Sequence, residues 1–144
     1  MNRPMFALTL PSDLRMLSVA RNFVEAVCQA CTLERGVMHA LVLSTGEAVS
    51  NIVRHAHRDL NHAEMRIHLD IQPDGVLITF FDQGRPFDIA TVPELPPGEL
   101  RIGGRGVYLL RTLMDEVQCG PRDDQPGNKL RLFKRWSGPV KSVG

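Results

Sequence analysis

The sequence lacks the features that mark a nucleic-acid-binding or membrane-spanning protein. Its 17 Lys and Arg residues nearly balance 16 Asp and Glu residues, for a formal net charge of +1 at pH 7, whereas a nucleic-acid-binding domain normally has a basic face. No apolar run approaches the roughly 20 residues that cross a bilayer. The start, MNRPMFALTLPSDLR, has neither the apolar core nor the small-residue cleavage site of a signal peptide. We therefore expect a soluble, cytoplasmic protein without direct nucleic-acid or membrane contacts.

Cysteine is also scarce, and its three residues cannot all pair within one chain. Cys28 and Cys31 form a C-x-x-C motif, which occurs in redox sites and as half of a zinc site. Here the motif lies within an amphipathic helical pattern, and no second pair follows it. We interpret the two cysteines as small apolar core residues one helical turn apart.

The first half of the chain predicts a strand followed by two helices. Residues 5–10 (MFALTL) have strand character, and a helix begins after Pro11 with Ser12 as its predicted N-cap. A second helix is predicted from about Glu34 to His57. It is apolar over much of its circumference, which predicts burial against a sheet.

The second half predicts two hairpins separated by a loop and a helix. Residues 65–71 alternate strictly, a turn follows, and residues 76–81 return as a strand. Residues 84–106 are rich in proline and glycine and show no periodicity, so we expect a long loop, of the kind that serves as a lid or is disordered. A helix over residues 107–117 and a final hairpin complete the pattern. The predicted fold is a single α+β domain spanning residues 1–144, a two-layer sandwich with helices on one face of a mostly antiparallel sheet.

Polar residues interrupt the second predicted helix in a regular way. Glu47 and Asn51 are four residues apart and therefore share one helical face. His55 extends the same row. Because the rest of this helix requires apolar partners, a polar row indicates either a functional site or a solvated stripe.

An acidic residue stands at the end of an apolar strand in the segment FFDQGRPFD (80–88). The Asp82 carboxylate is only an acceptor when ionised, and the exocyclic amine of adenine is a donor. Guanine presents an acceptor oxygen at the equivalent place and would be repelled. With Gly84 leaving room for a planar ring, Asp82 predicts an adenine-selective pocket.

A glycine-rich segment, Gly103-Gly104-Arg105-Gly106, opens the third predicted helix. Glycines allow backbone N–H groups to approach an anion, and a helix N-terminus carries partial positive charge. The Arg105 guanidinium can also pair with phosphate oxygens. Neither a dinucleotide fingerprint nor a P-loop fits the spacing.

Together, E-A-x-x-N, D-x-G-x-P-F-D and G-G-x-G followed by a hydrophobic residue resemble the adenine-nucleotide-binding fold shared by gyrase, Hsp90, sensor histidine kinases and MutL. The stand-alone length, with the opening LPSDLRMLSVARNFVEAV, is similar to the bacterial anti-sigma factor serine/threonine kinases of the RsbW and SpoIIAB type. The resemblance extends over nearly the whole chain.

This resemblance implies a role for each motif. Glu47 would be the general base, and Asn51 would supply its amide oxygen to Mg²⁺. Asp82 and Gly84 would bind the adenine of ATP. Backbone and side-chain groups of the glycine-rich segment would close over the phosphates: Gly104, Arg105 and Gly106.

The resemblance also implies partners. The chain would phosphorylate a serine on a STAS-type anti-sigma antagonist, alternately bind a sigma factor, and form a homodimer through its sheet. The alternative is a nucleotide-dependent anti-sigma or adaptor module without phosphotransfer, and a third hypothesis is a simple ATPase. Arg15 and Arg21 on the first predicted helix mark either a docking face or a solvated one.

The sequence departs from the family pattern at one place. Family members commonly carry Gly-Thr before the last strand, whereas this chain has Gly127-Asn128-Lys129. The adenine-side contact of the threonine is therefore altered or absent. His55, His57 and His62 lie close in sequence, but neither their spacing nor the family predicts a metal site.

Overall fold

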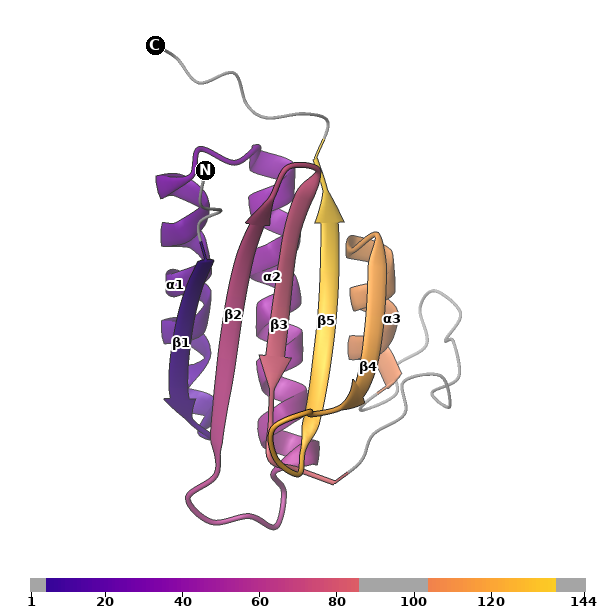
Figure 1. Cartoon of the computed structure of the whole chain (residues 1–144). Coiled ribbons are helices and arrows are strands. Elements are labelled where there is room, and N and C mark those ends of the chain that lie inside the picture. Colours follow the sequence, from indigo (N-terminus) through magenta and orange to yellow (C-terminus); the bar gives the residue numbers. More distant parts are fainter. Residues whose placement is uncertain (1–4, 86–103, 137–144) are drawn as a thin grey trace.

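A computed structural model describes residues 5–85 and 104–136, which form one layer of strands and one layer of helices (Figure 1). The five strands lie in the order β1-β2-β3-β5-β4, and each neighbouring pair is antiparallel. The helices cover one face of the sheet. The predicted α+β sandwich is confirmed. In chain order the elements are β1 (Met5–Pro11), η1 (Leu14–Met16), α1 (Leu17–Ala30), α2 (Arg35–Asn51), η2 (Ile52–Ala56), β2 (Glu64–Gln72), β3 (Gly75–Phe81), α3 (Gly104–Leu113), β4 (Glu116–Pro121) and β5 (Asn128–Arg135).

The core lies between the sheet and α2, the central helix of the second layer (Figure 1). Strand alternation directs one set of apolar side chains toward the helices, including the fully buried Ile67, Ile78 and Phe80. From the helix side, Leu41 and Val49 of α2 are equally buried. The central position of α2 explains why its sequence is apolar on several sides, as predicted.

The start of the first helix differs from the prediction. Asp13, not Ser12, is the N-cap: its Oδ1 accepts a hydrogen bond from the Arg15 backbone N–H at 2.8 Å. A single turn of 3-10 helix follows before α1 begins at Leu17. The Ser12 hydroxyl is instead bonded to His57 at 2.7 Å. A tertiary contact thus engages the residue that local sequence favours as a cap.

The second helix has the predicted extent, but its last turn is wider than an α-helix. Residues Ile52–Ala56 form a π-helical turn, and the His57 backbone N–H donates to the Ile52 carbonyl at 2.8 Å. Such turns often occur at functional sites. This one directs the chain from α2 toward the end of β3.

The third helix is shifted relative to its prediction. It begins at Gly104, three residues before Val107, and ends at Leu113 rather than Val117. Residues 116–121 pair with β5 instead, with Glu116 opposite Phe133. Most of the loop predicted over residues 84–106 lies outside the described residues.

The cysteines behave as core residues. Cys28 is buried in the helix–sheet core, where burial foremost and the neighbouring Cys31 next raise the pKa of its thiol to about 12. A thiol with so high a pKa is protonated at neutral pH and therefore weakly nucleophilic.

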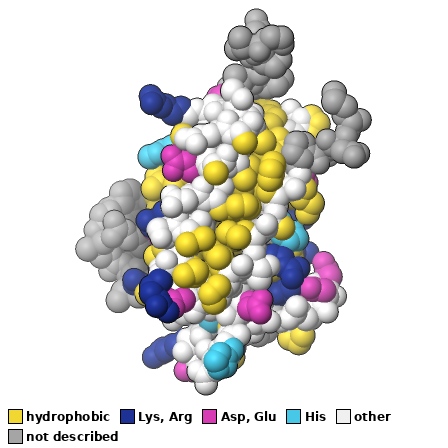
Figure 2. All heavy atoms as spheres, turned by 90° about the vertical axis from the view of Figure 1, so that its left-hand side faces the viewer, with side chains coloured by type: hydrophobic (Ala, Val, Ile, Leu, Met, Phe, Trp, Pro, Cys, Tyr) yellow, Lys and Arg dark blue, Asp and Glu magenta, His cyan; other side chains and the backbone are white. Residues whose placement is uncertain are grey.

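The side of the molecule formed by β1 and α1 carries a band of apolar side chains (Figure 2). Large exposed apolar residues occur on β1, η1 and α1: Met5, Leu14 and Val19. None of the described helices is long and apolar enough to span a membrane.

Candidate functional site

The three sequence motifs lie at one end of the sandwich, where α2 ends, β3 ends and α3 begins (Figure 1). Glu47 and Asn51 both lie within α2, so the four-residue spacing places them on one helical face as predicted. Both side chains are half-buried, and neither forms a hydrogen bond with another described residue. A carboxylate and a carboxamide are thus free for a ligand near the end of the central helix.

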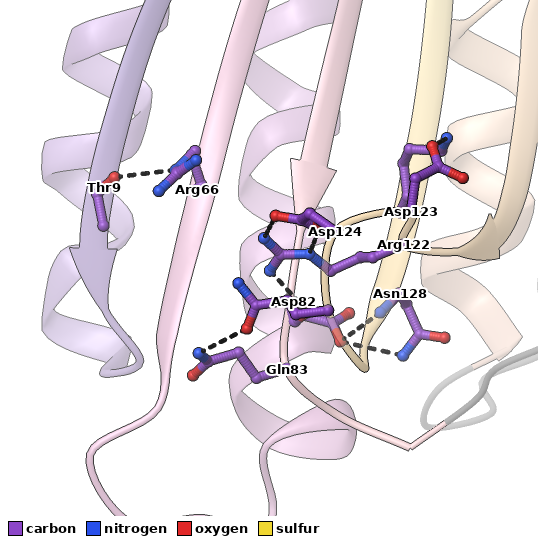
Figure 3. A network of polar contacts seen from close by, with 10 residues as sticks. Thr9, Arg66, Asp82, Gln83, Arg122, Asp123, Asp124 and Asn128 are labelled. Atoms are coloured by element: carbon purple, nitrogen blue, oxygen red, sulfur yellow. Dashed lines mark hydrogen bonds and ion pairs between the residues drawn. The ribbon is translucent and has the colours of Figure 1, made fainter.

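Asp82 directly follows β3 and is only 6% exposed (Figure 3). Its Oδ1 accepts three hydrogen bonds: from the Gly84 backbone N–H at 2.7 Å, the Asn128 Nδ2 at 3.0 Å and the Asn128 backbone N–H at 3.3 Å. Three donors offset much of the cost of burying this oxygen as part of a carboxylate.

The second oxygen of the same carboxylate is in a different position. Asp82 Oδ2 accepts no hydrogen bond from residues 5–85 or 104–136, and it is not one of their buried unsatisfied atoms. It therefore has no hydrogen-bond donor within the described part of the chain. The carboxylate has one oxygen committed to the protein and one available to a donor from outside.

Glycines allow the backbone around Asp82 to pack closely. A Cβ on Gly84 would lie 2.2 Å from the Ala56 carbonyl oxygen. The end of β3 can therefore contact η2 only because residue 84 lacks a side chain. The close contact between Gly84 and Ala56 lies within the protein and is separate from the space for a planar base that the sequence predicts at Gly84. Gly127 has φ +142°, and a Cβ there would lie 2.0 Å from the Asp82 carbonyl oxygen.

Arg122 holds the main chain of Asp82 from the β4–β5 turn (Figure 3). Its side chain is 5% exposed, and Nη1 donates to the Asp82 carbonyl oxygen at 3.1 Å. Nη2 pairs with Asp124 Oδ2 at 2.9 Å, which lowers the pKa of Asp124 to about 2. The guanidinium carbon lies 5.2 Å from the centre of the Phe81 ring. The turn is thereby fixed against the end of β3.

His57 connects three segments beside Asp82. Its Nε2 accepts a hydrogen bond from the Gln83 backbone N–H at 2.8 Å, so the neutral ring carries its proton on Nδ1 and donates to Ser12 Oγ at 2.7 Å. Burial lowers the pKa of His57, while the negative charge of Asp82 opposes this shift. The neutral ring thus ties the end of η2 to the residue after β1 and to the residue after Asp82.

An open cavity of about 410 Å³ lies where η2 meets the end of β3. Arg85 and Asp59 form an exposed ion pair of 3.3 Å beside it. The lining residues are His55, Ala56, Arg58, Asp59, Leu60, Gln83, Gly84 and Arg85. The structure therefore places a hollow beside Gln83, Gly84 and Arg85, and Asp82 is not among its lining residues.

The glycine-rich segment is described in part. The backbone of Gly104, Arg105 and Gly106 forms the first turn of α3, as phosphate binding by a helix N-terminus requires. Gly103 lies outside the described residues. The described part of the chain contains no group of three or more His, Cys, Asp or Glu side chains arranged to hold a metal ion.

Two basic residues of the first helical segment are already engaged. Arg15 pairs with Asp13 at 2.6 Å on the surface. Arg21 lies over α2, because a Cβ on Gly46 would come within 2.8 Å of the Arg21 Nε. The guanidinium of Arg21 is therefore close to the residue that precedes Glu47.

Sequence reasoning missed Arg122 and the link between Ser12 and His57. The turn GPRDDQPGN gives no sign that its arginine is buried, because charged turn residues are usually solvated. The only available signal for His57 was its position two residues after His55, which ends the polar helical row.

We predict that His57 makes stability depend on pH. Since the folded pKa lies below the ordinary value of 6.5, stability is complete above about pH 6.5 and is lost as the pH falls below it. His57→Gln should flatten this dependence in urea unfolding measured between pH 8 and pH 5. His68, whose pKa is also lowered mainly by burial, leaves a residual slope. An unchanged slope in His57→Gln would contradict the assignment.

We also predict that Gly127→Ala destabilises the protein by at least about 1–3 kcal/mol, because a side chain at a positive φ clashes with the Asp82 carbonyl. Gly36→Ala is the matched control. A Cβ at Gly36 meets nothing within 4 Å, and this helical substitution should be neutral or stabilising by up to about 1 kcal/mol. Chemical denaturation of the three proteins measures both effects; equal stabilities would refute the clash.

The comparisons with known proteins agree with the fold. Residues 10–134 match the family model described as "Histidine kinase-like ATPase domain". A protein named "Serine-protein kinase RsbW" from Oceanobacillus iheyensis is 29% identical over 135 residues, covering 88% of this chain and 84% of that protein. A protein of the same name from Listeria innocua is 29% identical over 119 residues, covering 77% and 76%.

A solved structure supports the fold alone. It is the histidine kinase domain of a blue-light activated histidine kinase from Erythrobacter litoralis, with a TM-score of 0.51 and 14% sequence identity. The match covers 88% of this chain and 61% of that chain, so the present chain spans about three fifths of its length. With the family model matched over most of its length, the chain belongs to the histidine kinase-like ATPase domain family.

Proposed function

We propose that this protein is an ATP-dependent serine/threonine kinase and anti-sigma factor that phosphorylates a STAS-type antagonist in a partner-switching system. The observation that carries the proposal is the Asp82 carboxylate, in which Oδ1 accepts three hydrogen bonds and Oδ2 accepts none from the described residues. The names of the similar serine-protein kinases support the reaction.

The base-binding step follows from the chemistry of Asp82. Oδ2 is an acceptor and matches the donor amine at position 6 of adenine. A purine with a carbonyl at this position would place two acceptors against each other. The cavity of about 410 Å³ is lined by Gln83, Gly84 and Arg85, which follow Asp82, and has the volume of a small-molecule site, for which roughly 300–1,000 Å³ is typical. The site therefore favours ATP over GTP.

The phosphate-binding step depends on α2 and α3. The backbone N–H groups at Gly104, Arg105 and Gly106 begin α3, where the helix dipole favours anions. The half-buried Asn51 carboxamide has no partner in the described chain and has the hard oxygen that Mg²⁺ prefers. Bound there, Mg²⁺ would neutralise charge on the phosphate oxygens.

Glu47 is proposed as the general base. It lies one helical turn before Asn51 on the same face, so a hydroxyl that approaches the phosphates meets the carboxylate. Glu47 would accept the proton of the attacking serine hydroxyl as the terminal phosphoryl group leaves ATP. ADP and a phosphoserine are the products.

The proposed partners are a serine-bearing STAS antagonist and a sigma factor, with the chain acting in the cytoplasm as a homodimer. A second candidate function is a nucleotide-dependent adaptor without phosphotransfer. It is favoured by one observation: Asn128 occupies the position where Gly-Thr is expected, and its side chain contacts Asp82. Phosphotransfer onto an antagonist distinguishes the two.

We predict that Glu47→Ala lowers phosphotransfer from ATP by about 10²–10⁴-fold, the usual contribution of a general base. ATP affinity should change little, because Glu47 is not proposed to contact the adenine. Labelled ATP, a candidate STAS antagonist and detection of acid-stable phosphoserine give the measurement. Glu116→Ala on the edge strand β4 is the control and should transfer normally. Intact transfer by Glu47→Ala would refute the role.

A further inference from the structure

We propose that Asn128 is a positioning residue that sets the base preference of the site by fixing the Asp82 carboxylate. The inference rests on the proposed function, because it concerns the same nucleotide site. It assigns selectivity for a 6-amino purine to two residues that act together, one of which never contacts the base.

Asn128 is bonded to Asp82 through both its main chain and its side chain. It is the first residue of β5 and is 3% exposed. Its backbone N–H donates to Asp82 Oδ1 at 3.3 Å, and its carbonyl accepts from the Asp82 backbone N–H at 3.0 Å. Its Nδ2 donates to the same Oδ1 at 3.0 Å (Figure 3).

The same Nδ2 also donates to the carbonyl oxygen of Arg85. A carboxamide nitrogen carries two hydrogens, and here they serve two acceptors three residues apart. The Asn128 side chain therefore closes the segment Asp82–Arg85 across its ends. The Gly84 N–H, which bonds Oδ1 at 2.7 Å, closes it from within.

No other described side chain holds the carboxylate itself. Arg122, the other buried neighbour, donates to the Asp82 main-chain carbonyl. Among residues 5–85 and 104–136, rotation of the carboxylate about its Cβ–Cγ bond is therefore restrained by one side chain, Asn128, and by two backbone N–H groups. The direction in which Oδ2 points depends on this restraint.

This restraint decides selectivity because a fixed acceptor discriminates better than a mobile one. While Oδ1 is held by the protein, Oδ2 meets position 6 of the base as an unpaired acceptor, and the carbonyl of a 6-oxo purine cannot donate to it at that position. If the carboxylate rotates, its oxygens can turn to solvent or to internal donors. ATP then loses a well-aligned hydrogen bond, and a 6-oxo purine is no longer rejected.

The substitutions Asn128→Thr and Asn128→Val test the inference as a matched pair. The two side chains have the same shape and suit a strand equally, but only threonine keeps a hydrogen-bond donor for Oδ1. Calorimetric titration with ATP and with inosine triphosphate, each with Mg²⁺, gives the ratio of the two dissociation constants. This ratio reports on the edge of the base at positions 1 and 6, where the two nucleotides differ, and a general loss of stability does not alter it.

We expect Asn128→Thr to retain most of the wild-type preference for ATP, and Asn128→Val to reduce it by about tenfold, as loss of a charge-assisted hydrogen bond implies. Leu132→Ala, which truncates a core side chain of the same strand, should lower thermal stability and leave the ratio unchanged. Titrations are made below the melting temperature of each variant.

Two results would overturn the inference while leaving the proposed function intact. In both, the wild-type protein prefers ATP. In the first result Asn128→Val keeps the full preference, and in the second Asn128→Thr and Asn128→Val lose the preference equally. A wild-type protein that binds no ATP would refute the proposed function and this inference with it.

Discussion

The site depends on the hydrogen bonds that hold one oxygen of the buried Asp82 carboxylate and leave the other oxygen without a partner among the described residues. Asp82 Oδ1 accepts three hydrogen bonds from the protein, and Oδ2 accepts none from the described residues. A carboxylate that is 6% exposed would be costly without such partners. Since its partners among the described residues are all on one oxygen, the carboxylate is held in place while its second oxygen remains an unpaired acceptor within that part of the chain.

The fold supplies these partners from distant parts of the chain. β3 carries Asp82 to the end of the sheet, and the neighbouring β5 brings Asn128 beside it. The π-turn after α2 approaches Gly84, and His57 ties that turn to Gln83 and Ser12. Sheet order and a widened helical turn therefore build the surroundings of Asp82. Glu47 and Asn51 share one face of α2, the helix that precedes this turn.

Much of this arrangement was predictable because it follows from periodicity. Strict alternation in β2 and the apolar circumference of α2 gave the layers, and the spacing of Glu47 and Asn51 gave their common face. Contacts between segments were not predictable. Ser12 has the composition of a cap and bonds His57 instead, and Arg122 is a buried turn residue. Local propensity carries no information about which distant group a polar side chain meets.

The most direct test of the account is the nucleotide preference of Asp82→Asn, measured by calorimetry with ATP and inosine triphosphate. Three donors surround Oδ1, so the single oxygen of the asparagine must take that position, and its NH₂ group must replace Oδ2. A donor then faces the base. The account predicts at least a roughly tenfold loss of ATP affinity and a preference shifted toward the 6-oxo purine. Unchanged ATP affinity and preference in Asp82→Asn would contradict it.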